Sequence, residues 1–221
     1  MGVLIAIVGP TGSGKTTVAR LLESRGLIRI ASTTTRRPRP GEVVGRDLHV
    51  TTEAEFQRCL SRGDLIAPVR YGTTDYGVRR SHLAIAAARN TPSLIIVEPS
   101  GLGPLHQWAQ EEGVGFFAVF CTATPDALSD RLRHRYARHA HSAEFSERLA
   151  CAASESRSWA AMWPYDLIVT NEDSDALATM ISTLIEQGVV RRVASTPLEK
   201  RVIDVDTSVE LPELFRVAAM C

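Results

Sequence analysis

Residues 9–17, GPTGSGKTT, place a lysine and hydroxyl side chains within a glycine-rich segment. The segment fits the pattern G-x-x-x-x-G-K-[ST] and lies between a short apolar run and an amphipathic stretch, as phosphate-binding loops do. Glycines let successive N–H groups point into one concavity, and a helix beginning there adds partial positive charge. Only two of the 25 basic residues are lysines. A lysine in this glycine-rich segment is therefore unlikely to reflect the composition of the chain alone. The pattern therefore favours a bound nucleotide over an accidental glycine-rich turn.

The chemistry of this loop assigns its residues. The ammonium of Lys15 would reach the outer phosphates of the nucleotide, and the Thr16 hydroxyl would bind Mg²⁺. The expected nucleotide contacts in the loop are Gly9, Thr11, Gly12, Ser13, Gly14, Lys15, Thr16 and Thr17.

A second group of chemically suggestive residues is the arginine cluster in TTTRRPRPGEVVGRD (33–47). Arg36, Arg37 and Arg39 fall within four positions and are flanked by prolines. Planar guanidinium groups bind phosphate in bidentate fashion, and prolines stiffen the segment that presents them. The cluster is therefore either a phosphate clamp or a solvated basic turn, and we expect Arg37 to face solvent in both cases.

The elements that must position these residues alternate between strand and helix. Apolar runs predict buried strands, and stretches with helical periodicity predict helices between them. The expected strands are 3–9, 27–31, 92–101, 115–124 and 165–173, and the expected helices are 16–26, 51–63, 78–90, 125–139, 142–162 and 174–188. Thr52 with Glu55 predicts a capping box, and Pro125 predicts a helix start. The alternation indicates an α/β fold with a parallel sheet covered on both faces.

Composition narrows the functional class. The net charge is zero and 44% of the residues are hydrophobic, which argues against a nucleic-acid or membrane-surface binder and allows a full core. The four cysteines lack metal-ligand spacing, no apolar run could span a membrane, and the first residues do not form a signal peptide. We therefore expect a cytoplasmic protein with free thiols.

Residues 189–221 fall outside the strand–helix alternation, and a short alternating stretch there could add an edge strand or support a homodimer.

Together, these motifs resemble the guanylate kinase family over roughly residues 1–188. The family pairs the phosphate loop with S-x-x-T-R-x-P-R-x-G-E-x-x-G-x-D-Y. That pattern reads here as Ser32, Thr35, Arg36, Pro38, Arg39, Gly41, Glu42, Gly45, Asp47 and then Leu48. Later family motifs match TTDYGV (73–78), IVE (96–98), LSDRLRHRY with ERL, and IVTNED (168–173).

The resemblance implies a P-loop NTPase fold: a doubly wound parallel sheet of about five strands with an inserted subdomain and a helical lid. Residues 1–32 and 79–188 would form the core, 33–78 the acceptor-binding insertion, 131–149 the lid, and 189–221 an extension of unknown role. The implied reaction is in-line phosphoryl transfer from ATP, with Mg²⁺, to a nucleoside monophosphate. The implied partner is thus a small-molecule nucleotide.

The resemblance also implies roles for the arginines. Arg36 and Arg39, with Tyr76, would grip the phosphate of the acceptor. Arg135 and Arg148 of the lid would bind charge that develops on the transferred group, and Arg131 would cover the ATP side. Arg133 and Arg138 have an equally good interpretation as an ordinary charged helix face.

Other residues have a functional and a plain interpretation side by side. Glu98, at the end of a strand, would orient Mg²⁺ and its water or would cap the next turn. Asn171 would lie near adenine or serve as an ordinary turn residue. Trp159 and Trp163 are expected on a helix face packed against the core. His134, His139 and His141 could suggest a metal site, but no cysteine or carboxylate completes it.

The residues that would read the base depart from the family. Four polar guanine readers are replaced by the apolar Leu48, Ala67, Val78 and Ile96, whereas Ser32 and the phosphate-gripping residues are retained. Guanine donors buried against apolar side chains would lose about 1–3 kcal/mol each. We therefore predict little guanylate kinase activity and a different acceptor, such as a 5-substituted pyrimidine deoxynucleotide or a sugar phosphate. His49, Arg70 and Asp75 are candidates for new polar contacts.

Four functions are compatible with these motifs. The first is a nucleoside monophosphate kinase with an altered base preference. The second is a true guanylate kinase with substitute contacts, and the third is a ribose-phosphate kinase. The fourth is a catalytically silent interaction module, which the intact Lys15 and Thr16 disfavour.

Overall fold

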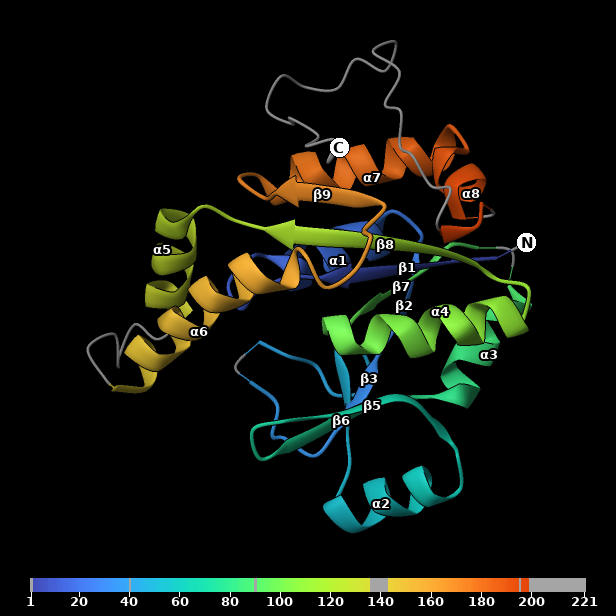
Figure 1. Ribbon diagram of the computed structural model, residues 1–221, viewed down its shortest axis with the longest axis horizontal. Helices are drawn as coiled ribbons and strands as arrows, with labels where there is room; N and C mark the ends of the chain where they lie inside the picture. Colours follow the sequence, from blue (N-terminus) through green and yellow to red (C-terminus); the bar gives the residue numbers. More distant parts are fainter. Residues whose placement is uncertain (1, 40, 90, 136–142, 195, 199–221) are drawn as a thin grey trace. The chain divides into compact units, whose positions relative to one another are not determined.

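The computed structural model describes residues 2–39, 41–89, 91–135, 143–194 and 196–198 (Figure 1). Its larger sheet has five strands in the order β2-β7-β1-β8-β9. Their bounds are β1 Val3–Val8, β2 Ile28–Ile30, β7 Ser93–Ile96, β8 Gly115–Thr122 and β9 Leu167–Thr170. β2 pairs with β7, and β8 with β9, in parallel register. The α/β fold with a five-stranded parallel sheet is therefore confirmed.

The central strand β1 explains why the sequence predicts this sheet. All six of its residues are buried, as expected for a strand covered on both faces. Helices lie between the strands and after the last strand, β9. They are α1 Lys15–Ser24, α3 Arg80–Ala88, α4 Leu102–Glu111, α5 Pro125–Arg135, α6 Ala143–Trp159, α7 Ser174–Glu186 and α8 Val189–Ala194, with a 3₁₀ turn, η1, at Pro99–Gly101. Asp173 caps α7 by accepting hydrogen bonds from the N–H groups of Asp175 and Ala176.

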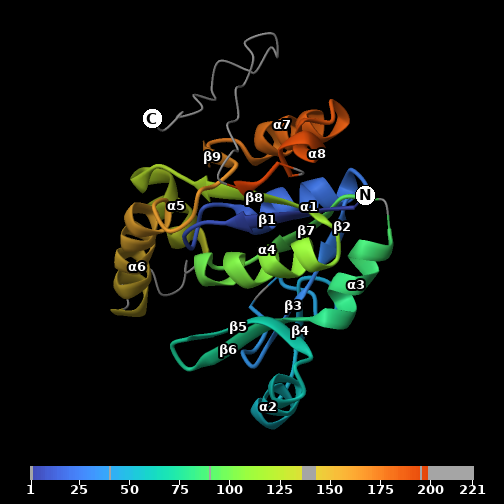
Figure 2. The same cartoon turned by 45° about the vertical axis from the view of Figure 1, so that its right-hand side comes forward.

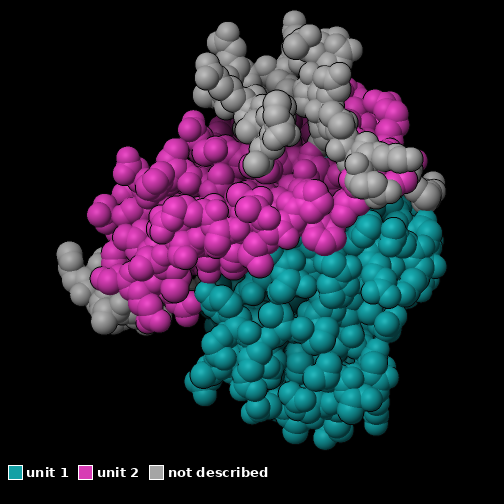
Figure 3. Space-filling view, viewed as in Figure 1, with its two compact units in different colours: residues 1–6, 23–117 teal, residues 7–22, 118–221 magenta. Residues whose placement is uncertain are grey.

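The chain divides into two compact units, coloured separately in Figure 3. The first contains residues 1–6 and 23–117, and the second contains residues 7–22 and 118–221. The arginine cluster lies in the first unit, and the phosphate loop with α5 and α6 lies in the second. Each candidate site can therefore be built from contacts within a single unit.

The first unit contains a second sheet, in the order β4-β3-β6-β5. Its strands are β3 Ser32–Thr34, β4 Leu48–Val50, β5 Leu65–Tyr71 and β6 Thr74–Arg79. β3 is parallel to β4 and antiparallel to β6, which is also antiparallel to β5. Helix α2 (Glu53–Ser61) lies beyond β5 and β6 in Figures 1 and 2 and packs through Phe56 and Cys59 onto Leu65. Thr52 caps α2 by accepting a hydrogen bond from the Glu55 N–H, which confirms the predicted cap.

The sequence-based assignment differs from the structure at several elements, among them the expected strand 92–101, which ends at Ile96 and is followed by η1. It missed α4, whose start in GLGP carries residues that disfavour helices. It missed β5 and β6, because Pro68 and a bulge between Ile66 and Val69 interrupt the alternation of a strand. It also extended the helix of α6 past its end at Trp159, so Trp159 and Trp163 do not share a helix face.

The segment that follows α7 begins with α8, which the sequence did not predict. Val190 and Ala194 bury one side of this short helix. The remaining tail, 199–221, lies outside the described residues, as does its proposed edge strand. Among the residues that the structure describes, no helix is both long and apolar enough to cross a membrane.

Candidate active site

The phosphate loop connects β1 to α1, as predicted. Gly9, Gly12 and Gly14 have φ values of 155°, 89° and 90°, in a region that favours glycine. A Cβ added at Gly9 would lie 1.9 Å from the carbonyl oxygen of Cys121 on β8. A Cβ at Gly14 would lie 2.3 Å from Nδ2 of Asn171. The glycines are thus required both by the backbone conformation and by close neighbours.

The side chain of Lys15 folds back onto the main chain of the phosphate loop. Its Nζ donates to the carbonyl oxygens of Gly9 and Pro10, each at 2.7 Å. Lys15 and Thr16 are half-buried at the start of α1, and Thr17 is exposed. The ammonium group is thus held at a glycine-rich turn that leads into a helix start, where positive charge favours the phosphates of a nucleotide.

Hydrogen bonds to the carbonyl oxygen of Ser13 fix the phosphate loop to neighbouring elements. It accepts hydrogen bonds from Asn171 Nδ2 at 2.7 Å, from Arg131 at 3.3 Å and from the Cys121 thiol at 3.5 Å. Burial is the largest cause that raises the pKa of Cys121, so the thiol remains a neutral donor. Asn171 is fully buried, so its amide supports the loop and is not an exposed turn residue. Arg131 also donates to the carbonyl oxygen of Asn171 at 2.8 Å.

Replacing Gly14 by alanine tests the close packing of this loop. The added Cβ would overlap the Asn171 amide, so we expect a lower melting temperature and ATP binding weakened by at least about tenfold. Thermal unfolding and ATP titration would measure both effects. Gly26→Ala is the matched control, because Gly26 has a similar φ of 94° and no atom within 4 Å of an added Cβ. An equal loss in both variants would show that only backbone strain matters.

The arginines that the resemblance assigns to a lid lie on α5 and α6. Arg135 is exposed at the end of α5, and Arg148 is half-buried on α6. Arg133 is exposed and pairs with Asp130 one turn away, as an ordinary charged helix face would. Arg138, His139 and His141 lie outside the described residues, and no cluster of metal-ligating side chains occurs in the described ranges.

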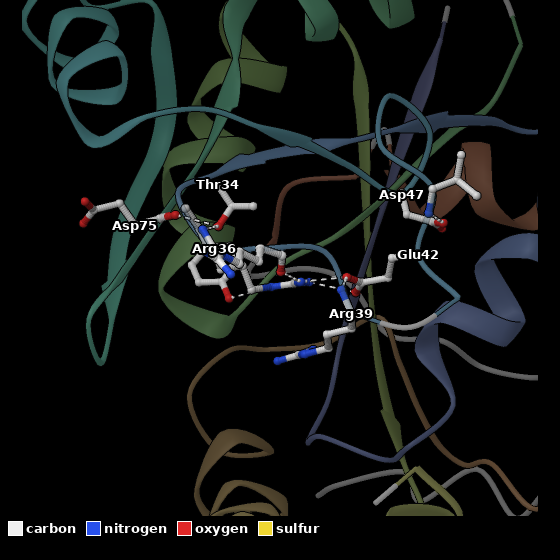
Figure 4. A network of polar contacts seen from close by, with 9 residues as sticks. Thr34, Arg36, Arg39, Glu42, Asp47 and Asp75 are labelled. Carbon is white, nitrogen blue, oxygen red and sulfur yellow. Dashed lines mark hydrogen bonds and ion pairs between the residues drawn. The ribbon is translucent and has the colours of Figure 1, made fainter.

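The arginine cluster forms a hydrogen-bonded group in the first unit (Figure 4). Arg36 donates through Nε to the Tyr76 hydroxyl at 3.1 Å. Its two terminal nitrogens bind the two oxygens of Glu42 at 2.6 and 2.7 Å, a bidentate pair. The same carboxylate accepts a hydrogen bond from the main-chain N–H of Arg39 at 2.7 Å. Arg37 is exposed, as predicted.

Glu42 is therefore a central residue of this group, and sequence reasoning did not place it among the site residues. One carboxylate ties the Arg36 side chain to the Arg39 main chain, while the Arg39 side chain extends away from it in Figure 4. Burial would raise the pKa of Glu42, but hydrogen bonds from Arg36 and Arg39 outweigh it and hold that pKa below its usual value. The Arg36–Glu42 pair is thus intact at neutral pH and is lost only as the pH falls through that lowered pKa. The signal was present in the sequence as the carboxylate that ends R-x-P-R-x-G-E.

The loop that carries the cluster is anchored to the larger sheet through β2. Asp47 and Arg29 form an ion pair at 2.6 Å, and their side chains are only 2% and 6% exposed. Asp47 also accepts a hydrogen bond from the Val43 N–H at 2.8 Å. A buried ion pair with a further hydrogen bond fixes the end of the loop next to β4.

The four apolar positions where the resemblance expects base readers lie in the first unit, and contacts there relate them in two separate pairs. Leu48 pairs with Ser32 across β3 and β4, and the Ser32 hydroxyl donates to the carbonyl oxygen of Ile96 at 3.4 Å. Val78 pairs with Ile66 of β5, the residue before Ala67. Leu48, Ala67 and Val78 are buried, and Ile96 is half-buried.

Ala67 has an unusual backbone. Its φ of 49° makes it the one non-glycine residue with positive φ in the described part of the chain. Ala67 lies in the bulge of β5. A Cβ added at Gly101 would lie 3.4 Å from the Cβ of Ala67. Such strain in a non-glycine residue concentrates at functional sites. The positive φ of Ala67 therefore marks the bulge of β5 as a place where the backbone is strained.

Residues expected to offer new polar contacts have varied surroundings. Arg70 is exposed and lies 3.9 Å from both Glu53 and Asp75. The main chain of Asp75 binds Thr34 and Thr35, and Figure 4 shows its carboxylate directed away from Arg36.

Glu98 occupies the N-cap position of η1 without a side-chain capping bond, which contradicts the plain capping interpretation.

His49 and His82 form a ring pair with centroids 4.5 Å apart. Burial is the main cause that lowers the pKa of both rings, and the nearby Arg79 adds to it. The two histidine rings are therefore protonated at a lower pH in the folded protein than in the unfolded chain. The stability contributed by the neutral rings is present above about pH 6.5 and is lost as the pH falls through the lowered pKa values.

The double variant His49→Gln, His82→Gln tests this contribution. We expect the free energy of unfolding to fall less between pH 7.5 and pH 5 in this variant than in the unmodified protein. Urea unfolding at both pH values would measure the difference. An equal fall in the two proteins would show that the histidine pair does not contribute.

Comparisons with known proteins agree with this geometry. The sequence profile of the family described as guanylate kinase matches residues 1–188. A guanylate kinase from Wolbachia sp. subsp. Brugia malayi is 30% identical over 86% of this chain and 95% of its own length. One from Nitrobacter winogradskyi is 31% identical over 95% of this chain and 93% of its own length. The crystal structure of guanylate kinase from Anaplasma phagocytophilum superposes with a TM-score of 0.62 at 25% identity, covering 92% of this chain and 90% of the other. The chain therefore belongs to the guanylate kinase family and is a nucleoside monophosphate kinase.

Proposed function

We propose that this enzyme transfers the γ-phosphoryl group of ATP to the phosphate of a nucleoside monophosphate whose base is not guanine. The observation that carries the proposal is a contrast within one unit. Arg36, which would bind the acceptor phosphate, is hydrogen-bonded to Tyr76 and Glu42, whereas Leu48, Ala67 and Val78 are buried apolar residues where the resemblance places guanine-reading side chains.

The donor side of the reaction is assigned to the phosphate loop. The N–H groups of Thr11 and Ser13 already donate to Glu155 and Pro10, so the phosphates of ATP would be bound by the main-chain N–H groups of Gly12 and of residues 14–17 and by the ammonium of Lys15. The hydroxyl of Thr16 would be a ligand for Mg²⁺, which neutralises charge on the phosphates when it is bound. The positive-φ glycines support this assignment, because the loop conformation and the close neighbours Cys121, Leu132 and Asn171 leave no room for side chains at these positions.

The acceptor side is assigned to the segment 33–78. The Arg36 guanidinium, aligned by Tyr76 and Glu42, and the Arg39 guanidinium would bind the acceptor phosphate. The segment 131–149 would act as the lid, with Arg135 and Arg148 placed on the transferred group. Positioning and charge stabilisation would then supply most of the rate enhancement.

The apolar positions define the class of base. Guanine carries ring N–H and amino donors that would be left unpaired beside Ala67 and Ile96, at about 1–3 kcal/mol each. A smaller base with an apolar substituent, such as a 5-substituted pyrimidine, would bury there a substituent that carries no hydrogen-bond donor. Ser32 and the ring pair of His49 and His82 lie on or beside the same small sheet and could supply the remaining polar contacts.

A coupled assay of ADP formation over a panel of monophosphates tests this specificity. The panel contains GMP, AMP, CMP, UMP, dCMP, dTMP, a further 5-substituted deoxypyrimidine monophosphate and ribose phosphates. We expect kcat/KM for a 5-substituted pyrimidine to exceed that for GMP by at least about tenfold. GMP as the best acceptor would identify a true guanylate kinase with substitute contacts. Turnover confined to ribose phosphates would identify a sugar-phosphate kinase.

A further inference from the structure

A buried carboxylate lies against the phosphate loop. Glu155 of α6 is 7% exposed, and its Oε2 accepts a hydrogen bond from the Thr11 N–H at 3.1 Å. The two residues are 144 positions apart and belong to the same compact unit. Asp166, another buried carboxylate, ties β9 to β8 through the Ala118 N–H. Glu155 instead joins α6 to the loop that would bind the donor.

Apolar packing continues this connection between α6 and the loop. A Cβ at Gly12 would lie 3.3 Å from Cγ of Leu132, so α5 packs directly on the loop. Leu132 belongs to the same buried cluster as Phe145 and Ala152 of α6. The loop, α5 and α6 therefore form one packed layer, in which Glu155 supplies the polar contact. A carboxylate makes a stronger hydrogen bond to an N–H group than a neutral acceptor does.

The helical period relates Glu155 to Arg148. Positions 148, 152 and 155 are separated by four and three residues, so they lie on one face of α6. Ala152 in the middle of this face is fully buried, and Arg148 is half-buried two turns before Glu155. The rise of an α-helix separates the two residues by roughly 10 Å along the axis. Any rotation or slip of α6 at Glu155 would move Arg148 as well.

We propose that Glu155 is a positioning residue for phosphoryl transfer, which fixes α6 against the phosphate loop and thereby places Arg148 on the transferred group. This inference rests on the proposed function, because Arg148 acts in that reaction. Glu155 itself touches the loop and not the reacting atoms. Its substitution should therefore lower kcat more than it changes the KM for ATP.

A double-mutant cycle with Arg148 tests the inference. Glu155→Ala is expected to lower kcat by about 10–100-fold with the KM for ATP changed less than about threefold. Glu155→Gln, which retains an acceptor for the Thr11 N–H, should recover most of the loss. In the Arg148→Ala background, Glu155→Ala should lower kcat by no more than about twofold further. Glu147→Ala and Arg157→Ala, both exposed on α6, are matched controls and should leave kcat unchanged.

The possible results distinguish a failure of the positioning role of Glu155 from a failure of the proposed function. If the unmodified enzyme transfers phosphate and the losses from Glu155→Ala and Arg148→Ala are additive, the positioning role is overturned and the proposed function stands. A raised KM for ATP with unchanged kcat would also overturn it, because Glu155 would then act on the loop alone. An unmodified protein that binds ATP without transfer to any monophosphate would remove both proposals. If Glu155→Ala fails to fold, Glu155→Gln and Glu155→Asp decide: full activity in Gln with a loss in Asp supports the role, and equal activity in both overturns it.

Discussion

Replacing Lys15 by methionine is expected to lower kcat for phosphoryl transfer by about 10³-fold or more. Lys15 provides the one lysine ammonium in the described part of the chain, and its Nζ already lies 2.7 Å from two loop carbonyl oxygens. Methionine has a similar length and no charge, so it removes the ammonium while keeping the volume. Steady-state kinetics at saturating ATP and acceptor would measure the loss.

Two controls accompany this variant. Circular dichroism and thermal unfolding should show that the protein remains folded, because Lys15 is only half-buried. Arg133→Met removes a cation from the same unit that pairs with Asp130 on an exposed helix face, and it should retain near-normal kcat. A Lys15→Met enzyme within tenfold of normal kcat would contradict the assignment of this loop to the donor phosphates.

Replacing Arg36 by alanine is expected to lower kcat/KM for the acceptor by about 10²–10³-fold, with little change in the KM for ATP. The Arg36 guanidinium is held by Tyr76 and by both oxygens of Glu42, so its orientation is set before the acceptor arrives. Glu42→Gln should lower the same parameter by about tenfold, because the bidentate pair becomes weaker. Initial rates over a range of acceptor concentrations would measure both variants.

The neighbouring arginine provides the matched control. Arg37 is exposed in the same loop, and Arg37→Ala should change kcat/KM by less than about twofold. Because Glu42 would act through Arg36, the double variant Arg36→Ala, Glu42→Gln should be no worse than Arg36→Ala alone. Equal losses from Arg36→Ala and Arg37→Ala would indicate a general basic turn and contradict a specific phosphate clamp.

The phosphate loop could be predicted from the sequence because its chemistry is local. Three glycines, Lys15 and Thr16 lie within eight residues, and the flanking strand and helix have clear patterns. The parallel sheet was predictable for a similar reason, since runs such as VLIAIV are buried as whole strands. Helix α4 was missed because glycine and proline at its start disfavour a helix, and tertiary burial of Leu105 and Trp108 overrides that local preference.

The supporting residues of both sites could not be predicted in the same way. The resemblance places Asn171 near the nucleotide, but local spacing does not indicate that Asn171 and Glu155 contact the phosphate loop from positions 158 and 144 residues away. The bidentate contact between Arg36 and Glu42 depends on how the loop turns, although both residues belong to one motif. The conformation of Ala67 follows from a bulge that alternation cannot reveal.

The most direct measurement is ³¹P NMR of the enzyme with ATP, Mg²⁺ and its best acceptor from the panel. The spectrum should show one ADP and one new nucleoside diphosphate for each ATP consumed, and neither product should accumulate with Lys15→Met. Release of inorganic phosphate without a second diphosphate would contradict phosphoryl transfer between the loop of Lys15 and the acceptor held by Arg36.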